Sequence, residues 1–245
     1  MIYSTNEPSS SVGDGLGAAP NGWSFSGEVS KSFDEHVTRS VPDYHRMHSL
    51  ILNLTDFFVR QDSLVYDLGC STGSLSNRLA QRFEDTRDRA RVVGIDLEPE
   101  MIKFAQSNNH HPAISYVVGD VRDTELEKCS FVIMNLTAQF IPPSDRILLF
   151  NRIWESLEWS GALILFEKIR GSDARFQEIF SVLYRDFKIS RGFSESEIVA
   201  KEKSLRGVME PFSEYGNLQL LREAGFQDIE TVFRSIPFSG FLAIK

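Results

Sequence analysis

The stretch Val65-Tyr66-Asp67-Leu68-Gly69-Cys70-Ser71-Thr72-Gly73 decides the fold of this chain. The apolar run 64–66 is typical of a buried strand, and it leads into an acidic residue and a turn with two glycines. A helical pattern of apolar residues follows from Leu75 onward. Glycine at a turn from strand to helix allows a tight backbone and lets a ligand approach the main chain closely. The stretch therefore predicts a strand–turn–helix unit with a ligand at its turn.

Two further carboxylates follow predicted strands. Asp96 ends the apolar run 92–95, and Asp120 comes after the run 114–118. A carboxylate in the first position can accept hydrogen bonds from two ribose hydroxyls. One in the second can accept from an adenine amino group, with Val121 packed on the ring. Each acid alone could be a helix N-cap, but together with Asp67 they indicate a nucleoside-binding site on a doubly wound sheet.

The glycine turn does not match the dinucleotide fingerprint. That fingerprint is Gly-x-Gly-x-x-Gly, with helix amides free to hold a pyrophosphate, whereas the turn here, residues 69–74, has a different glycine spacing. Asp67 would repel a pyrophosphate and suits a cationic amino group. The order of the motifs resembles motif I, post-I and motif II of class I S-adenosylmethionine (SAM)-dependent methyltransferases. This resemblance implies SAM as the cofactor, with Asp67 and Gly69 at the methionine, Asp96 at the ribose and Asp120 at the adenine.

Composition and charge exclude several classes of protein. The 245 residues, 42% apolar and 24% charged, fit one soluble globular domain. The net charge of −8 disfavours direct nucleic-acid binding. Two cysteines, Cys70 and Cys129, suggest reduced thiols in a cytoplasmic protein. No run reaches the roughly eighteen apolar residues that a membrane helix needs, and the histidines show no metal-ligand spacing.

The rest of the pattern alternates strands with helices and closes in a β-hairpin. A Ser-, Gly-, Pro- and Asn-rich stretch, residues 1–22, is expected to be a disordered tail before a single domain, 23–245. Strands are expected at 64–68, 91–96, 114–118, 130–134, 162–166, 228–233 and 237–244, and helices at 42–58, 74–84, from 99, from 142 to before Gly161, and at 218–224. This order predicts a seven-stranded, Rossmann-like α/β sheet. The helical segment 173–210 interrupts it and is expected to be a lid over the substrate.

Several peptides, within these motifs and beyond them, resemble carboxy-S-adenosylmethionine synthase, a bacterial enzyme that converts SAM and prephenate to carboxy-SAM. The peptides are residues 23–25, 39–44, 65–71, 119–123, 135–140, 167–168, 186–188 and 194–198. The resemblance extends from about Trp23 to Lys245 and implies a homodimer. It also implies that Tyr44 closes over the methionine end of the cofactor and that Asn135 lies beside the reacting centre. The cofactor contacts expected from both resemblances are Tyr44, Asp67, Gly69, Cys70, Ser71, Asp96, Leu97, Asp120, Val121 and Asn135.

The chain departs from that family at one position of the lid. The family has a lid arginine that pairs with the carboxylate added to SAM, a task suited to a guanidinium group. An ungapped reading places Glu202 there, and a carboxylate would repel the carboxylate of carboxy-SAM. Neighbouring basic residues are expected to substitute only if the helix register shifts: Lys201, Lys203 or Arg206.

The sequence leaves three enzymatic activities open. Methyl transfer to a small acceptor comes first. The alternative is cyclisation of SAM itself to azetidine-2-carboxylate and methylthioadenosine, with Asp67 or Asn135 near the amine and Tyr184 near the sulfonium. Carboxy-SAM synthesis is a further alternative. The three intact acids argue against a catalytically idle SAM-binding module. The expected catalytic residues are Tyr44, Asn135 and Tyr184.

Overall fold

The computed structural model describes residues 10–11, 17–18, 29–86 and 89–245. Seven strands form one mixed sheet in the order β5-β4-β3-β6-β7-β9-β8. The first five positions hold parallel strands, and β9 is antiparallel to both β7 and β8. The strands are β3 Leu64–Leu68, β4 Arg91–Asp96, β5 Ile114–Val118, β6 Cys129–Asn135, β7 Leu157–Lys168, β8 Asp228–Ser235 and β9 Phe238–Ile244. The predicted seven-stranded α/β fold is confirmed.

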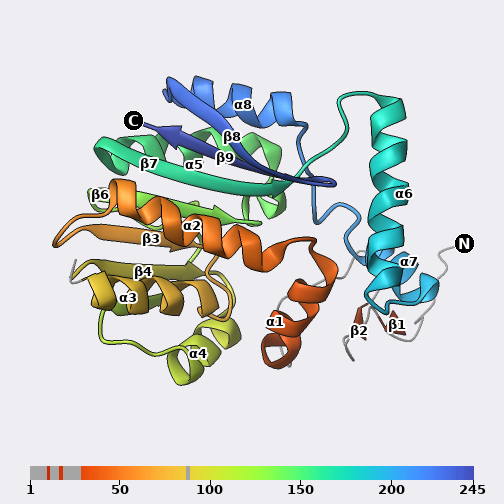
Figure 1. Cartoon of the computed structure of the whole chain (residues 1–245), viewed down its shortest axis with the longest axis horizontal. Coiled ribbons are helices and arrows are strands. Elements are labelled where there is room, and N and C mark those ends of the chain that lie inside the picture. Colours follow the sequence, from red (N-terminus) through yellow and green to blue (C-terminus); the bar gives the residue numbers. More distant parts are fainter. Residues whose placement is uncertain (1–9, 12–16, 19–28, 87–88) are drawn as a thin grey trace, which may run out of the picture.

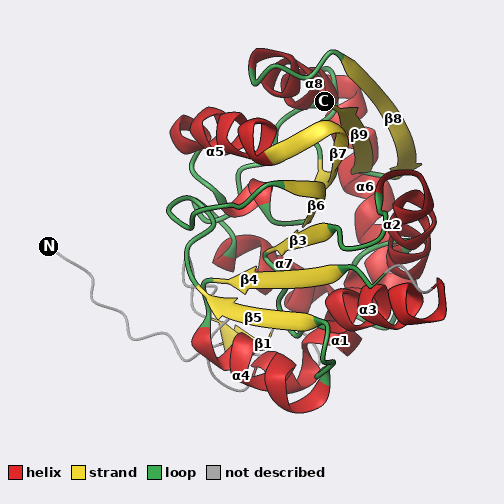
Figure 2. Cartoon of the chain, turned by 90° about the vertical axis from the view of Figure 1, so that its left-hand side faces the viewer, coloured by secondary structure: helices red, strands yellow, loops and turns green. Residues whose placement is uncertain are grey.

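Helices cover both faces of the sheet (Figure 2). They are α1 Val29–Ser40, α2 Tyr44–Phe58, α3 Ser74–Thr86, α4 Pro99–Asn108, α5 Pro143–Ser156, α6 Ala174–Ser190, α7 Glu195–Ser204 and α8 Glu214–Glu223, with a 3-10 turn at Ala138–Phe140. Side chains alternate along β3, so Leu64, Tyr66 and Leu68 pack with α5 and α8. Val65 faces the other way, toward α2 and α3. Asp67 shares that direction, which places it beside the start of α3.

Two predicted boundaries are wrong by several residues. The helix expected to run up to Gly161 ends at Ser156, and β7 begins at Leu157. Leu157 is buried and pairs with Cys129, so its burial in the sheet outweighs continuation of the helix. The helix expected at 218–224 begins earlier, at Glu214, because the Ser213 side chain caps it by accepting from the Gly216 amide at 3.1 Å.

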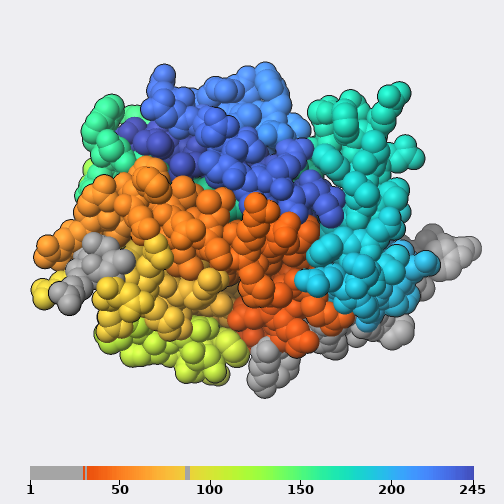
Figure 3. All heavy atoms as spheres, in the orientation of Figure 1, coloured from red at the N-terminus to blue at the C-terminus, as the bar shows by residue number. Residues whose placement is uncertain are grey.

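Residues 173–210, the helical insertion, lie between β7 and α8. In Figure 1, α6 stands at the right-hand end of the molecule with α7 beneath it. Asp173 caps α6 by accepting from the Phe176 amide at 3.0 Å, and Ser194 with Glu197 forms a capping box for α7. Figure 3 shows the insertion, in cyan, lying against the orange-red α1 segment. Caps at both helices fix the insertion as ordered structure that starts at defined residues.

Part of the stretch expected to be a disordered tail is paired. β1, Ser10–Ser11, and β2, Gly17–Ala18, form a two-stranded antiparallel sheet that lies next to α7 (Figure 1). The remainder of residues 1–22, and the expected start of the domain at Trp23, lie outside the described residues. Within the part of the chain that the structure describes, no helix is both long and apolar enough to cross a membrane.

Candidate functional site

A cavity of about 770 Å³ opens at the carboxyl ends of the parallel strands. The strand order reverses at β3, where β4 and β6 lie on either side, and such switch points are where α/β sheets bind ligands. α1, α2 and the helical insertion complete the wall. The cavity brings together every site residue expected from the sequence: Tyr44, Asp67, Gly69, Cys70, Ser71, Asp96, Leu97, Asp120, Val121, Asn135 and Tyr184.

The turn after β3 is built around Gly69. Its φ of +80° is left-handed, and a Cβ there would lie 2.3 Å from Thr137 Oγ1. The Thr137 hydroxyl donates to the Leu68 carbonyl at 2.9 Å, so the turn packs directly on the loop after β6. The neighbouring loop therefore requires glycine at this position, whether or not a ligand is bound. The sequence did not indicate this contact with the loop.

Asp67 lies at the bottom of the cavity and is only 2% exposed. Its Oδ2 accepts from the Ser76 hydroxyl at 2.6 Å, which ties the end of β3 to the first turn of α3. Burial raises the pKa of Asp67 to about 6, and the Ser76 hydrogen bond opposes that rise. The carboxylate thus organises the glycine turn while it also faces the ligand space.

Asp96 ends β4 with its carboxylate fixed by two backbone amides. Oδ2 accepts from Ser71 at 2.8 Å, and Oδ1 accepts from Glu98 at 3.0 Å. Burial raises its pKa, while these hydrogen bonds act in the opposite direction. Each oxygen keeps a lone pair for a ligand hydroxyl. The next side chain, Leu97, is 60% exposed and gives the cavity an apolar edge.

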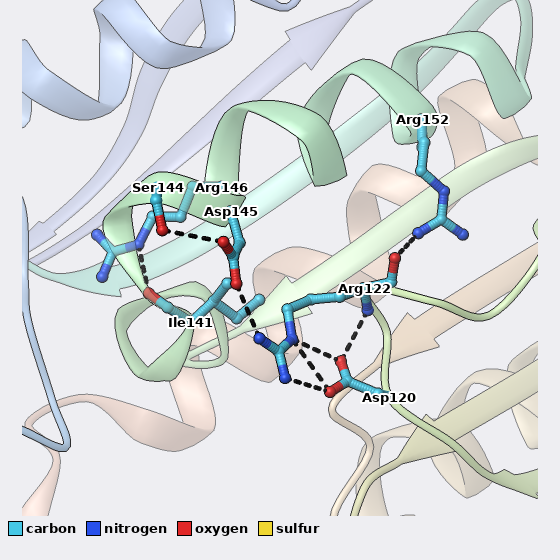
Figure 4. A network of polar contacts seen from close by, with 7 residues as sticks. All are labelled: Asp120, Arg122, Ile141, Ser144, Asp145, Arg146 and Arg152. Carbon is cyan, nitrogen blue, oxygen red and sulfur yellow. Dashed lines mark hydrogen bonds and ion pairs between the residues drawn. The ribbon is translucent and has the colours of Figure 1, made fainter.

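Asp120 is held by an arginine that sequence reasoning did not assign (Figure 4). Arg122 Nη2 donates to Asp120 Oδ2 at 2.6 Å, and Nε lies 3.0 Å from both carboxylate oxygens. Arg122 Nη1 also donates to Asp145 Oδ2 at 2.8 Å, which links the loop to α5. Hydrogen bonds from Arg122 lower the pKa of Asp120, so it stays ionised as an acceptor. The spacing Asp-x-Arg was the only sequence signal for this pair.

Asn135, at the end of β6, presents an unsatisfied acceptor. Its Nδ2 lies 3.2 Å from Nε2 of His48, whose pKa burial lowers to about 3, so the imidazole is neutral. The ring of Tyr44 packs on His48 with centroids 4.4 Å apart. Asn135 Oδ1 is buried and has no hydrogen-bond partner among the described residues. A buried amide oxygen of this kind is available to accept from a ligand donor. Sequence reasoning missed His48, because a histidine among apolar helix residues looks like a core residue.

Basic side chains from β7, α6 and α7 also line the cavity, and sequence reasoning assigned no role to Lys168 or Lys188. Lys168, at the end of β7, and Lys188, on α6, place their Nζ atoms 4.8 and 4.5 Å from the ring centroid of Tyr184. Lys201 on α7 lines the same space. Burial lowers the pKa of Lys188 to about 8 and that of Lys201 to about 5, with the charge of Lys188 contributing to the second shift. The Tyr184 hydroxyl donates to the Ser40 carbonyl at 2.9 Å.

Glu202 lies within this basic group. Its carboxylate accepts from Arg185 Nε at 3.2 Å and Nη2 at 3.4 Å. Its charge also raises the pKa of Lys168 and Lys188, against the larger effect of burial. Of the three basic residues considered as substitutes for the lid arginine, Lys201 and Arg206 line the cavity, whereas Lys203 is exposed outside it.

The cavity therefore has two walls of opposite charge. We call Asp67, Asp96, Glu98 and Asp120 the acidic wall. Four basic residues with two acids form the basic wall: Lys168, Lys188, Lys201, Arg206, Glu197 and Glu202. Among the described residues, no group of three His, Cys, Asp or Glu side chains is arranged to hold a metal ion. The acidic wall, the exposed Leu97 and the unpartnered Asn135 oxygen fit a cationic adenosyl compound.

Comparison with known proteins agrees with this geometry. Residues 65–161 match the family model of the methyltransferase domain. Carboxy-S-adenosyl-L-methionine synthase of Staphylococcus epidermidis is 34% identical over 227 residues, which cover 92% of this chain and 98% of that protein. The enzyme of that name from Shewanella oneidensis is 36% identical over 225 residues, covering 90% and 92%. Human N-acetylserotonin methyltransferase in complex with SAM has a similar fold, with a TM-score of 0.62 and 16% identity over 88% of this chain and 54% of that one.

Proposed function

The chain belongs to the carboxy-S-adenosyl-L-methionine synthase family, and from this premise we propose that it transfers a carboxyl group from a small carboxylate donor to the methyl carbon of SAM. The product is carboxy-SAM. The fold and the family make the protein a SAM-dependent enzyme. SAM supplies an electrophilic, cationic sulfonium, and the protein supplies the orientation, the charge and the exclusion of water.

The acidic wall is the proposed SAM site. Asp96 would accept from the ribose hydroxyls, and Asp120, oriented by Arg122, would accept from the adenine amino group. Leu97 and Val121 offer apolar surface to the base. Asn135 Oδ1 would accept from the methionine end, with Tyr44 and His48 behind it. This placement leaves the sulfonium close to Asn135 and facing the basic wall.

The basic wall carries the proposal that the second substrate is an anion. Neither Lys168 nor Lys188 forms an ion pair with a described carboxylate, and both have lowered pKa values because they are desolvated. An incoming carboxylate would restore the lost charge stabilisation through charge-assisted hydrogen bonds. Here the lysines would take over the task that the lid arginine has in the resemblance to the family. The helical insertion would then act as the lid that holds the donor.

Cyclisation of SAM remains a second candidate because two observations favour it. The ungapped reading puts Glu202 at the position of the family's lid arginine, and Asn135 Oδ1 is a buried acceptor suited to an amino group. The SAM amino group, held there, could be oriented toward the γ-carbon of the same SAM molecule. Methyl transfer, the general activity of the fold, is the third outcome of the same assay.

The decisive assay incubates the purified protein with SAM alone and with SAM plus prephenate, and identifies products by mass spectrometry. We expect carboxy-SAM only when prephenate is present. Methylthioadenosine with azetidine-2-carboxylate from SAM alone would replace the proposal with cyclisation. S-adenosylhomocysteine formed only on adding an acceptor would replace it with methyl transfer. Lys188→Met should lower carboxy-SAM formation at limiting prephenate, and Lys203→Met, on the exposed side of α7, is the matched control.

A homodimer is proposed through α6. Its outer face exposes large apolar side chains at helical spacing: Phe176, Ile179, Val182 and Leu183. A monomer rarely leaves so continuous an apolar face uncovered. Light scattering after gel filtration should give twice the chain mass. Ile179→Glu with Leu183→Glu should give a monomer, whereas an unchanged mass would place any dimer contact elsewhere.

A further inference from the structure

The loop after Asn135 begins with a strained residue. Leu136 has a φ of +65°, in the left-handed region, which costs free energy for a residue that carries a Cβ. Such strain persists only where the surrounding structure holds it, and it gathers at functional sites. Leu136 lines the cavity directly after Asn135, whose Oδ1 has no hydrogen-bond partner among the described residues. The strain therefore lies beside the group that we place at the methionine end of SAM.

Hydrogen bonds hold the peptide groups on both sides of Leu136. The Leu136 amide donates to the Phe166 carbonyl, on β7, at 2.8 Å. The Leu136 carbonyl accepts from the Gln139 side chain at 3.2 Å, and that side chain in turn accepts from the Lys168 amide at 3.0 Å. The 3-10 turn that follows needs an acceptor of its own for its first amides.

Glu167 supplies that acceptor from the end of β7. Its Oε1 accepts from the Ala138 amide at 2.9 Å, and the side chain is buried and does not line the cavity. Burial raises the pKa of Glu167 to about 8, while the charge of Arg146 and the amides of residues 137–139 act in the opposite direction. Glu167 therefore acts on the loop and does not touch a ligand.

We infer that Glu167 is a positioning residue: it holds the loop so that Leu136 keeps its left-handed conformation and Asn135 Oδ1 stays open to the amino group of SAM. The backbone of Asn135 is fixed by its pairing with Phe166 in the sheet. A relaxed Leu136 would rotate the peptide that follows Asn135 and move the loop over its side-chain oxygen. The inference rests on the proposed function in one respect, namely that the methionine end of SAM lies at Asn135.

The test compares two ligands that share the thioadenosine part and differ in the amino acid. S-adenosylhomocysteine carries the amino and carboxyl groups, whereas methylthioadenosine has only a methyl group on the same sulfur. Titration calorimetry of the full chain measures both affinities. For Glu167→Ala we expect the affinity for S-adenosylhomocysteine to fall about tenfold, as for one lost hydrogen bond, and that for methylthioadenosine to stay within about twofold. Glu158→Ala, at the exposed start of β7, is the matched control.

Two conservative variants separate the reach of the side chain from its charge. Glu167→Gln keeps an oxygen at the position of Oε1 and should bind both ligands within about threefold of the natural sequence. Glu167→Asp keeps the charge but is one methylene shorter, so it should lose affinity for S-adenosylhomocysteine as Glu167→Ala does. If Glu167→Ala does not fold, Glu167→Asp takes its place in every comparison.

A second substitution, at Leu136, tests the strain directly. Glycine adopts a positive φ without the cost of a Cβ, so Leu136→Gly should keep the loop in place when Glu167 is lost. In the Glu167→Ala background, it should bring the affinity for S-adenosylhomocysteine to within about threefold of that of Leu136→Gly alone. Leu136→Ala keeps the Cβ and should recover nothing. Recovery by glycine alone is a result that a merely structural role of Glu167 would not give.

Four results would overturn the inference: an equal fall in both affinities, no fall in either, a loss in Glu167→Gln as large as that in Glu167→Ala, or recovery by alanine as well as by glycine. Neither ligand has a sulfonium, so no carboxyl transfer takes place in these measurements. The inference can therefore fail while carboxy-SAM formation succeeds, and the reverse.

Discussion

The acidic wall and the basic wall of one cavity differ in how the chain builds them. The acidic wall comes mainly from consecutive strand ends, β3, β4 and the loop after β5, each a short peptide with its own turn. The basic wall is assembled from β7, α6 and α7, whose contributing residues are far apart in the chain and meet only in the tertiary structure. In the proposed function, the first wall holds a nucleoside in a way common to many α/β folds, and the second selects the substrate that reacts with it.

Among the substitutions considered, the one at Asp96 in the acidic wall should have the largest effect on ligand binding. Asp96→Ala removes the two proposed ribose contacts and releases the Ser71 and Glu98 amides. We expect SAM affinity to fall about 100-fold, close to 2.7 kcal/mol, measured by titration calorimetry. Glu100→Ala, on the exposed first turn of α4, is the matched control. Unchanged SAM affinity would show that the acidic wall is not the nucleoside site.

Loss of a lysine from the basic wall should affect the other substrate. Lys188→Met keeps most of the side-chain volume and removes the charge. We expect KM for the carboxylate donor to rise about 30-fold, the typical loss of a hydrogen bond to a charged group, with SAM affinity within about twofold. Steady-state kinetics and calorimetry measure the two quantities separately. A fall in SAM affinity of the same size would mean that the two walls do not divide the ligands as proposed.

The sequence predicted the acidic wall because its signals are local. A strand, an acid and a glycine turn lie within nine residues around Asp67, and a strand followed by an acid recurs at Asp96 and Asp120. The basic wall has no such signature. Lys168, Lys188 and Lys201 are separated by 20 and 13 residues and look like ordinary helix or strand-end lysines. His48 was missed for the same reason. Only tertiary packing desolvates these groups and gives them chemical meaning.

The pH dependence of donor binding should also distinguish the walls. The Lys188 ammonium group predominates below its pKa of about 8 and is lost above it. The affinity for prephenate, measured without SAM, should therefore be constant from pH 6 to 7 and fall about tenfold between pH 7 and 9. Lys188→Met should bind weakly and show a flat profile over the same range. A tenfold fall that persists in this variant would assign the titration to another group of the wall.

A buried hydrogen-bond network around Arg146, which is 2% exposed, joins the two walls. Its Nε donates to the Ile141 carbonyl at 2.8 Å, and Nη2 donates to the Glu210 carbonyl at 2.6 Å, at the exit of the helical insertion. The Glu210 amide donates to the Gln139 carbonyl at 2.8 Å, and the Gln139 side chain accepts from the Lys168 amide at 3.0 Å. The loop after Asn135 is thus fixed to the base of the insertion.

Arg146→Lys should shift the two walls relative to each other without removing a proposed ligand contact from either. A single ammonium group cannot reproduce the fork that reaches both carbonyls. We expect kcat to fall about fivefold, because orientation is lost, with donor KM and SAM affinity changed by less than about twofold. Arg152→Lys is the counterpart on the same helix: Arg152 donates to the Arg122 carbonyl (Figure 4) and also to the Thr124 carbonyl. It should weaken SAM binding and spare kcat. If both variants lowered the same quantity, either kcat or SAM affinity, α5 would support the cavity as one rigid unit. The two walls would then differ only in their charge.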